Sequence, residues 1–504
     1  MINETKMKQI NRTTNSPRGR WLFRAALLAF ALCAGLSAAD KPDPGVLKML
    51  HRVTGVTDQD VAAARSAKEL SLYDAYALSV FNTETMTIEG ENSVQAALLR
   101  EQAITSFLPQ LSLKANKAFP AQKRNYQSLA RSAVSLYARM PIVTGLDEVA
   151  GIMASVSAVK LTELQLYDGA GRLLNDVSSS YYGVLLIRQN LVNNEQVLAL
   201  LERTQGEIRR RVDIGRSRKS DLVRTRAQMY SLEAQIKSLR SGLSTAEIGL
   251  GSITGAPAGT ALRDTAELPA PPYTLADESA VVEKRWDVKA AREQVEQAKA
   301  GLLAAYGTHL PSAYIEGSYM PYVEKPKSSN TDRAFDAYSL ASSWSATDPA
   351  ANALAIASVK NSKIKYRDYY VSFGVELPIL GSDITFAKVR QAHSVKRQAD
   401  LGLSRTERLA RQEFTDSYKT WESSIGELEA YKKALASAEE DYRLVDADYR
   451  LNQVTILDVL TSLTALQNAR NDYERALLQN RLDRIRLGIA AGEFYGDKIK
   501  ALKK

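Results

Sequence analysis

The chain of 504 residues contains one structural unit twice, and this duplication restricts its fold more than any other feature. FLPQLSL at 107–113 reappears as HLPSAYI at 309–315, and the two prolines are 202 positions apart. Pro141 of the first copy corresponds to Pro378 of the second copy, 237 positions later. The second copy therefore carries 35 more residues (237 − 202) between its two proline-marked segments, which predicts a long loop there.

The segments around these prolines alternate apolar and polar residues with a period of two. In the last segment the apolar face is made of Tyr369, Val371, Phe373, Val375 and Leu377. Such segments of about ten residues are typical of membrane-barrel strands, and they also fit the half-buried sheet of a soluble protein. Four strands cannot close a barrel, so the sheet must pack on helices of its own chain or be shared between copies.

Long helices are expected between the strands. Residues 383–451 contain no proline and only two glycines, and 69 helical residues would span roughly 100 Å. Residues 146–214 are the matching stretch of the first copy, with apolar residues at heptad spacing. Each stretch leads into a similar turn, at 212–223 and at 449–460. Helices of this length must pack side by side along their length.

The N-terminus is typical of a secretory signal peptide over residues 1–39, with a basic start and an apolar core at 25–35. An uncleaved membrane anchor is the alternative, although this core is shorter than the roughly 20 residues that span a bilayer. Cys33, the only cysteine, follows Leu32 where a lipoprotein has a small residue, so lipidation is disfavoured. No apolar run of about 18 residues follows, so no further transmembrane helix is expected.

The repeat and the composition shifts divide the chain into six parts. These are a signal peptide (1–39), an N-terminal periplasmic segment (40–65), the first repeat (66–254), a linker (255–275), the second repeat (276–495) and a C-terminal tail (496–504). The linker is rich in proline and alanine and is expected to be extended. The loop at 320–368 is rich in serine, alanine and asparagine, with a short helix expected at 349–358.

Composition and motifs disfavour several classes of function. The chain is 45% hydrophobic and 24% charged, which is typical of a folded protein. Its net charge of +9 is spread along the helical stretches, so nucleic-acid binding is not expected. His51, His309 and His393 lack metal-ligand spacing, and no nucleotide-binding loop or catalytic triad pattern is present. We therefore expect no cofactor, no metal and no enzymatic activity, and any energy must come from another protein.

The order and spacing of these segments resemble the outer-membrane efflux protein family, the TolC-like outer-membrane factors. The residues that carry the resemblance are the two strand starts, RWDVKAA at 285–291, VSFGVELPILG at 371–381 and the two turns. It covers about residues 66–495. It implies a mainly α fold with a small β part, in which a homotrimer forms a twelve-stranded β-barrel, four strands per chain, continued by a long α-helical coiled-coil tunnel.

The resemblance also implies a function and its partners. The chain would be the outer-membrane exit duct of a tripartite efflux or type I secretion system, and would passively transport small molecules or proteins. It would lie in the outer membrane of a Gram-negative bacterium and extend into the periplasm. Its partners would be outer-membrane lipid, a periplasmic adaptor (membrane fusion) protein and an inner-membrane pump. The alternative is a structural or adhesive coiled-coil surface protein, which would not need duplicated strand pairs.

The family pattern places a gate near the second turn. Asp458 matches an acidic pore position, whereas Thr461 occupies the second such position. Three Asp458 carboxylates around an axis would form a ring that favours cations. The alternative is that Asp458 caps the following helix, and both roles can coexist. Asp221 and Tyr449 match two members of a polar link that holds the closed tip. The arginine of that link is replaced by Val454, and Arg216 or Arg218 would have to substitute for it.

The turns themselves match the family's adaptor-contacting tips. The matching residues are Ile214, Gly215, Arg216, Leu451, Asn452 and Gln453. Asn452 replaces the usual glycine, and asparagine tolerates the left-handed conformation that ends many helices. The basic run at 209–219 is either a solvated helix end or a surface that attracts an acidic adaptor.

Overall fold

A computed structural model describes the chain from residue 44 to residue 494, with gaps, and residue 499. The described ranges are 44–117, 132–215, 217–263, 268–323, 368–378 and 386–494. Outside them lie the predicted signal peptide with Cys33, the tip residue Arg216, the expected helix at 349–358 with most of its loop, and the C-terminal tail apart from Ile499.

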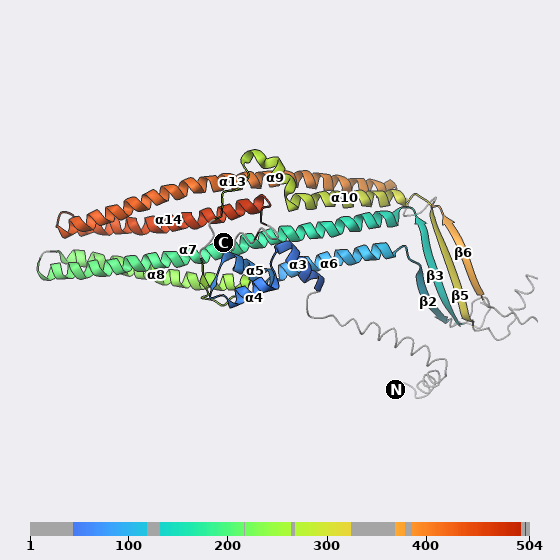
Figure 1. The fold of residues 1–504 in the computed structure, drawn as a ribbon, viewed down its shortest axis with the longest axis horizontal. Coiled ribbons are helices and arrows are strands. Elements are labelled where there is room, and N and C mark those ends of the chain that lie inside the picture. Colours follow the sequence, from blue (N-terminus) through green and yellow to red (C-terminus); the bar gives the residue numbers. More distant parts are fainter. Residues whose placement is uncertain are drawn as a thin grey trace, which may run out of the picture.

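Two long helical hairpins form most of the molecule (Figure 1). The first hairpin joins α7 (Asp147–Asp213) to α8 (Lys219–Thr254), and the second joins α13 (Phe386–Arg450) to α14 (Ile456–Ala490). The two predicted long helices are confirmed, because α7 and α13 run for 67 and 65 residues without interruption. At about 1.5 Å per residue each is roughly 100 Å long.

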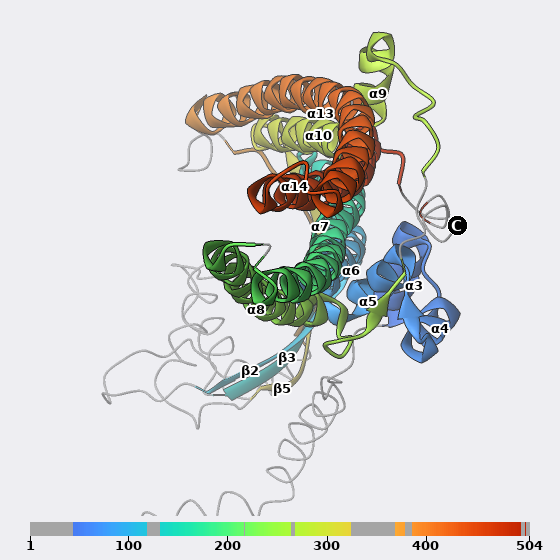
Figure 2. The same cartoon turned by 90° about the vertical axis from the view of Figure 1, so that its left-hand side faces the viewer.

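We call the long, side-by-side helices of the molecule the rods. Two shorter helices extend the rods at the end opposite the hairpin turns. They are α6 (Glu84–Thr105) and α10 (Trp286–Gly307), and they pack beside α7 and α13 (Figure 1). Each leads directly into a strand, as the repeated order of helix and strand predicts. Seen end-on, the rods form an open arc (Figure 2).

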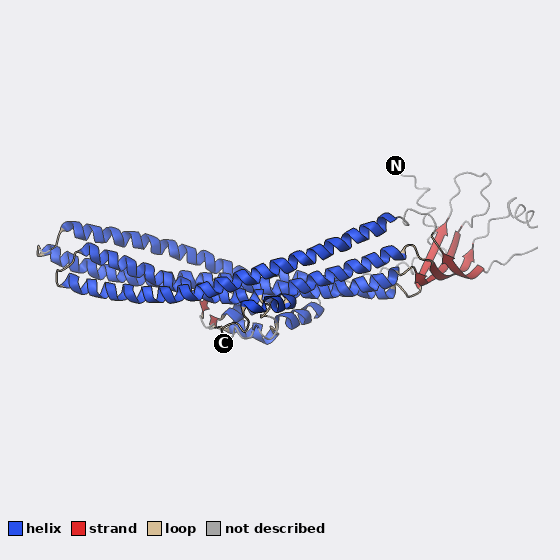
Figure 3. Ribbon diagram, turned by 90° about the horizontal axis from the view of Figure 1, so that it is seen from above, coloured by secondary structure: helices blue, strands red, loops and turns tan. Residues whose placement is uncertain are grey.

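A four-stranded antiparallel sheet lies at the end of the rods, beyond α6, α7, α10 and α13 (Figure 3). Its strands are β2 (Gln110–Lys117), β3 (Ser132–Thr144), β5 (Ser312–Val323) and β6 (Asp368–Glu376), in the order β2-β3-β5-β6. Strand β3 continues through Pro141, where the register with β5 shifts. A bulge accommodates a residue that lacks the N–H for the ladder.

The register places the alternating apolar residues of all four strands on one face of the sheet. Leu113 pairs with Leu136, Leu136 with Tyr319, and Tyr319 with Tyr369. This face is bare, since its large side chains are between 38% exposed (Leu136) and 78% exposed (Val371). No helix among the described residues covers it (Figure 3). The sheet is therefore not the half-buried sheet of a soluble protein within this chain.

The opposite face of the sheet is polar and internally bonded. The Tyr137 hydroxyl donates a hydrogen bond of 2.7 Å to Glu316 from the neighbouring strand, and Ser372 donates one of 3.4 Å to the same carboxylate. The Arg139 guanidinium lies 4.2 Å from the centre of the Tyr314 ring. In a water-soluble protein the apolar face of such a sheet is covered by other elements. Here the apolar face is the uncovered one.

Small elements pack against the middle of the rods, on the convex side of the arc (Figure 2). They are α3 (Pro44–Thr54), α4 (Asp58–Ser66), β1 (Glu69–Leu70), α5 (Leu72–Asn82), β4 (Ala261–Leu262), the 3₁₀ helix η1 (Leu275–Asp277) and α9 (Glu278–Lys284). The linker is not wholly extended, because β4 pairs in parallel with β1. The Tyr181 hydroxyl of α7 donates to the Leu70 and Arg263 carbonyls beside this pair.

The apolar core is distributed along the rods in separate clusters. The largest lies mid-length, where Tyr73 and Tyr76 of α5 meet Val177 and Tyr181 of α7. A second cluster near the hairpin turns joins all four hairpin helices through residues such as Ile208 and Val459. Many other apolar side chains of the rods remain exposed in a single chain. The rods are therefore only partly covered by their own chain.

In the part of the chain that the structure describes, one helix meets the length and composition criteria for crossing a membrane, which was not expected from the sequence. An 18-residue window of α7 has a mean hydropathy of 1.2, and 22% of it is buried within the chain. This is weak support for a span, because α7 continues for 67 residues and packs lengthwise against α6, α8, α10 and α14. Its exposed apolar side chains fit contacts with neighbouring copies equally well.

Two glycines connect the sheet to the rods at one crossing point. Gly145 (φ +62°) precedes α7 and Gly307 ends α10, and their backbones touch so closely that a Cβ on either would collide with the other's carbonyl. Leu146 follows with φ 75°, a conformation that is costly for a leucine. This backbone contact sets the position of the sheet relative to the helices.

We expect Gly307→Ala to destabilise the protein by about 1–3 kcal/mol, the usual cost of overpacking. The matched control is Gly301→Ala in the same helix, where a Cβ meets open space and helix propensity predicts a change between zero and about 1 kcal/mol of stabilisation. Thermal unfolding in detergent measures both. Equal midpoints for the two variants would contradict a tight glycine joint.

Candidate functional site: the two hairpin tips

Each hairpin ends in a tight turn at the same end of the molecule (Figure 1). We call residues 214–218 the first tip and residues 451–455 the second tip. Gly215 (φ 72°) and Asn452 (φ 59°) both adopt the left-handed conformation, as expected for Asn452 at a glycine position. The tips are exposed, with Ile214 at 66% and Leu451 at 67% of full exposure.

Asp458 caps the start of α14 from its third position. Its carboxylate accepts hydrogen bonds from the Thr455 backbone N–H (2.8 Å) and hydroxyl (2.6 Å). Hydrogen bonds from Thr455 hold the pKa of the exposed Asp458 carboxyl below its usual range. The capping role that the sequence left open is therefore present. Because Asp458 is exposed, its charge remains available to a pore as well.

Asp221 takes the same position in the first hairpin. Its carboxylate accepts hydrogen bonds from the Arg218 backbone N–H (3.2 Å) and from the Ser217 hydroxyl (3.1 Å). Among the described residues it forms no hydrogen bond with Tyr449, the second member of the polar link that the resemblance implies. Thr461 is exposed one turn further along α14, and its hydroxyl donates to the Leu457 carbonyl in its own helix.

Arg211 connects the first hairpin to the second tip, whereas the sequence indicated it only as part of a basic run. Arg211 lies in the last turn of α7 and reaches across to the second hairpin. It donates hydrogen bonds to the Tyr449 carbonyl (3.2 Å) and to the Asn452 side-chain oxygen (2.9 Å). Its guanidinium lies 4.6 Å from the centre of the Tyr449 ring.

Tyr449 is buried at 6% exposure in the apolar cluster near the tips. Burial raises the pKa of its hydroxyl, and the positive charge of Arg211 offsets part of this increase. Val454, in place of the family's arginine, packs partly buried against the same cluster. The second tip is thus held by the apolar packing of Tyr449 and Val454 and by the hydrogen bonds that Arg211 donates.

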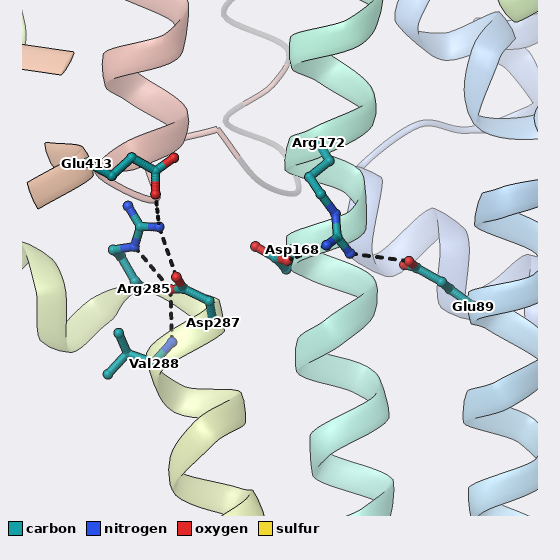
Figure 4. A network of polar contacts seen from close by, with 7 residues as sticks. All are labelled: Glu89, Asp168, Arg172, Arg285, Asp287, Val288 and Glu413. Carbon is teal, nitrogen blue, oxygen red and sulfur yellow. Dashed lines mark hydrogen bonds and ion pairs between the residues drawn. The ribbon is translucent and has the colours of Figure 1, made fainter. Parts of the chain in front are cut away.

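A second polar site lies mid-length, where RWDVKAA begins α10 (Figure 4). Arg285 is 8% exposed and bonds to Asp287, to Glu413 of α13 (2.6 Å) and to the Ala490 carbonyl of α14 (2.8 Å). The next residue, Trp286, stacks on a tyrosine of α7. This motif therefore joins the start of α10 to the middle of α13 and the end of α14, which is a structural role.

Beside it, Arg172 of α7 lies between Asp168 (3.3 Å) and Glu89 of α6 (3.4 Å) (Figure 4). Burial raises the pKa of both carboxyl groups, and the Arg172 charge offsets part of that effect. These residues line a cavity of about 410 Å³ between α6, α7 and α10. No group of three or more histidine, aspartate or glutamate side chains in the described part of the chain is arranged to hold a metal ion.

We expect Asp458→Ala to loosen the start of α14, because it removes the acceptor of both capping bonds. Hydrogen exchange of residues 456–463 measures this, with Asp472→Ala as control, since Asp472 pairs with Arg475 in the middle of the same helix. The folded pKa is depressed, so the capping contribution is fully present above the ordinary carboxyl pKa of about 4. It is lost as the pH falls through the lowered folded value. Identical exchange in the two variants at neutral pH would contradict the capping role.

Comparison with known proteins gives relatives of one kind, although no family model matches the sequence. Outer membrane protein TolC of Escherichia coli (strain K12) is 23% identical over 412 residues, which cover 80% of this chain and 78% of that protein. Outer membrane protein TolC of Vibrio cholerae is 25% identical over 321 residues, which cover 61% of this chain and 66% of that protein.

Solved structures share the fold over nearly their whole length. VceC, an outer membrane protein from Vibrio cholerae, has a TM-score of 0.67 at 13% identity and covers 84% of this chain and 96% of that one. CusC has a TM-score of 0.68 at 16% identity, covering 87% and 93%. The open state of the MtrE outer membrane channel of Neisseria gonorrhoeae has a TM-score of 0.64 at 17% identity, covering 89% and 96%. The chain is therefore similar in sequence to outer membrane protein TolC and shares the fold of these outer-membrane channels.

Proposed function

We propose that three copies of this chain form an outer-membrane exit duct for a tripartite efflux or type I secretion system. The observation that carries this proposal is the sheet at the end of the rods, whose apolar face is bare. A surface of this kind is stable against lipid, because contact with lipid removes its apolar side chains from water. The polar face, with Lys114, Arg139 and Glu316, would line a water-filled lumen.

The open edges of the sheet support self-assembly. Among the described residues, strands β2 and β6 each have one unpaired edge, and unpaired backbone groups cannot remain in a bilayer. Pairing β6 of one copy with β2 of the next removes every edge, and four strands from each of three chains give a twelve-stranded barrel. The arc of the rods and their uncovered apolar side chains fit the same threefold closure (Figure 2).

The rods support a tunnel that leads away from the membrane. Helices of roughly 100 Å reach far beyond a hydrocarbon core of about 30 Å. The tips lie at the far end, where an adaptor protein and an inner-membrane pump would meet them. The described tip residues that we propose for adaptor contact are Ile214, Gly215, Leu451, Asn452 and Gln453. Asp458 and Thr461 would face the pore nearby, with three Asp458 carboxylates favouring cations.

Recording single channels in planar lipid bilayers tests the duct. The reconstituted full chain should give discrete conductance steps, with a low resting level if the tips are closed. An adhesive coiled-coil protein would give none. Protein that binds the bilayer without any conductance would overturn the proposal.

The lipid-facing role of the sheet predicts opposite outcomes for two adjacent residues. Val371 is on the bare face and Ser372 is on the polar face. We expect Val371→Arg to weaken barrel assembly by about 2–4 kcal/mol, the cost of arginine near the middle of a bilayer. Ser372→Arg faces water beside Glu316 and should assemble normally. The yield of membrane-inserted oligomer measures both, and equal yields would argue against a lipid-facing surface.

The gate assignment predicts that Asp221→Ala raises ion leakage through the resting channel. Losing this carboxylate frees the start of α8 and the first tip with it. Asp213→Ala removes an exposed acid from the same turn and serves as the control for charge alone. Conductance in planar bilayers is the measurement. If the resting current of the Asp221 variant equals that of the control, Asp221 has no part in the gate.

A further inference from the structure

We propose that Arg211 holds the two hairpin tips of each chain together and thereby stabilises the closed state of the duct. This inference rests on the proposed function, because the tips must separate for a closed tunnel to open. That such channels have an open state is stated for MtrE, whose structure shares this fold. Arg211 lies on the first hairpin and would take the role of the arginine that the family has at position 454 of the second hairpin.

The geometry makes Arg211 a bridge between elements that are far apart in sequence. It lies 238 positions before Tyr449 and 241 before Asn452, and one nitrogen, Nη1, donates to an oxygen of each. The side chain also covers the Tyr449 ring. Its neighbour Arg210 is exposed, and within the described part of the chain its hydrogen bond goes to the Gly206 carbonyl of its own helix. Of these two adjacent arginines, only Arg211 joins the hairpins.

Asn452 and Arg211 form a matched pair. The left-handed position at the end of α13 would suit glycine, but glycine has no side chain to accept a hydrogen bond. Asparagine tolerates this backbone and adds a carbonyl oxygen, which here lies 2.9 Å from Arg211. The two departures from the family pattern, at positions 452 and 454, therefore compensate each other. One removes an arginine from the second tip, and the other provides an acceptor for an arginine on the first hairpin.

The electrostatics favour the same interpretation. The last carbonyls of α13 carry the partial negative charge of the helix C-terminus, which attracts a cation. Tyr449 contributes one of these carbonyls, and its ring adds a cation–π contact. Among the described residues Arg211 forms no ion pair with a carboxylate. Because its contacts are with neutral groups, we expect salt to screen them less than it screens an ion pair.

The Arg211 contacts also lie where they most directly oppose separation of the two tips. The fully buried part of the apolar cluster that joins the two hairpins ends near Tyr449 and Ile456, and Val212 and Val454 lie partly buried at its tip end. Arg211 makes its contacts at the far side of this cluster, against the second tip. Separation of the tips must therefore break the Arg211 contacts, whereas the apolar cluster can stay packed and act as a hinge. Asp221 is occupied with its own helix start and does not cross to the second hairpin in the described residues.

Single-channel recording of four variants tests the proposal. Arg211→Ala removes the bridge, and Asn452→Gly removes its acceptor while keeping the left-handed backbone. Asn452→Asp makes the acceptor charged, and charge-assisted hydrogen bonds are the stronger kind. Arg210→Ala is the control, since it deletes the same charge one residue away. Oligomer mass and thermal midpoint are measured for each variant, so that a folding defect is recognised.

We expect Arg211→Ala and Asn452→Gly each to raise the open-state population by roughly tenfold, the factor that loss of one hydrogen bond to a charged group supports. Asn452→Asp should lower it below wild type, and Arg210→Ala should leave it unchanged. Equal gating of Arg211→Ala and wild type would overturn this proposal while leaving the duct intact. Absence of any channel in the wild-type protein would instead overturn the proposed function. A changed thermal midpoint with unchanged gating would make Arg211 a structural residue only.

Discussion

The bare apolar face of the four-stranded sheet is the constraint on which the rest of the structure depends. Side chains such as Val371 and Phe373 are more than half exposed, and no described helix covers them. Burying them against lipid satisfies the face, but it leaves two strand edges that only further copies can pair. The proposed membrane insertion and the proposed self-assembly therefore both rest on this uncovered apolar face. The polar face and its bonds around Glu316 are the complement that a water-filled interior requires.

The rods connect the sheet to the tips. Helix α7 begins at the glycine joint beside the sheet and ends two residues after Arg211, at the first tip. The helix is therefore one continuous element between the sheet and the tips. The mid-length joint around Arg285 ties α10, α13 and α14 together in the same way. The second tip is held by apolar packing of Val454 against the cluster near the tips and by the hydrogen bonds from Arg211.

Much of this fold could be predicted from the sequence, because its signals are long and repeated. Absence of proline predicted α7 and α13 to within a few residues, and period-two alternation predicted the strands. The alternation could not tell which face would be covered, since lipid and a protein core select the same residues. The β1–β4 pair inside the expected linker was missed, because two-residue strands leave no pattern. Arg211 was missed as a bridge because its partners are more than 230 positions away, and proximity of that kind appears only in three dimensions.

The central claim is that one chain is an incomplete part of a threefold tube. Sedimentation of the detergent-solubilised protein, with the bound detergent matched in density, measures the number of chains in the particle most directly. Our account predicts a particle of three chains, with no folded single chain at equilibrium. A stable single chain that needs no detergent to stay in solution would contradict it.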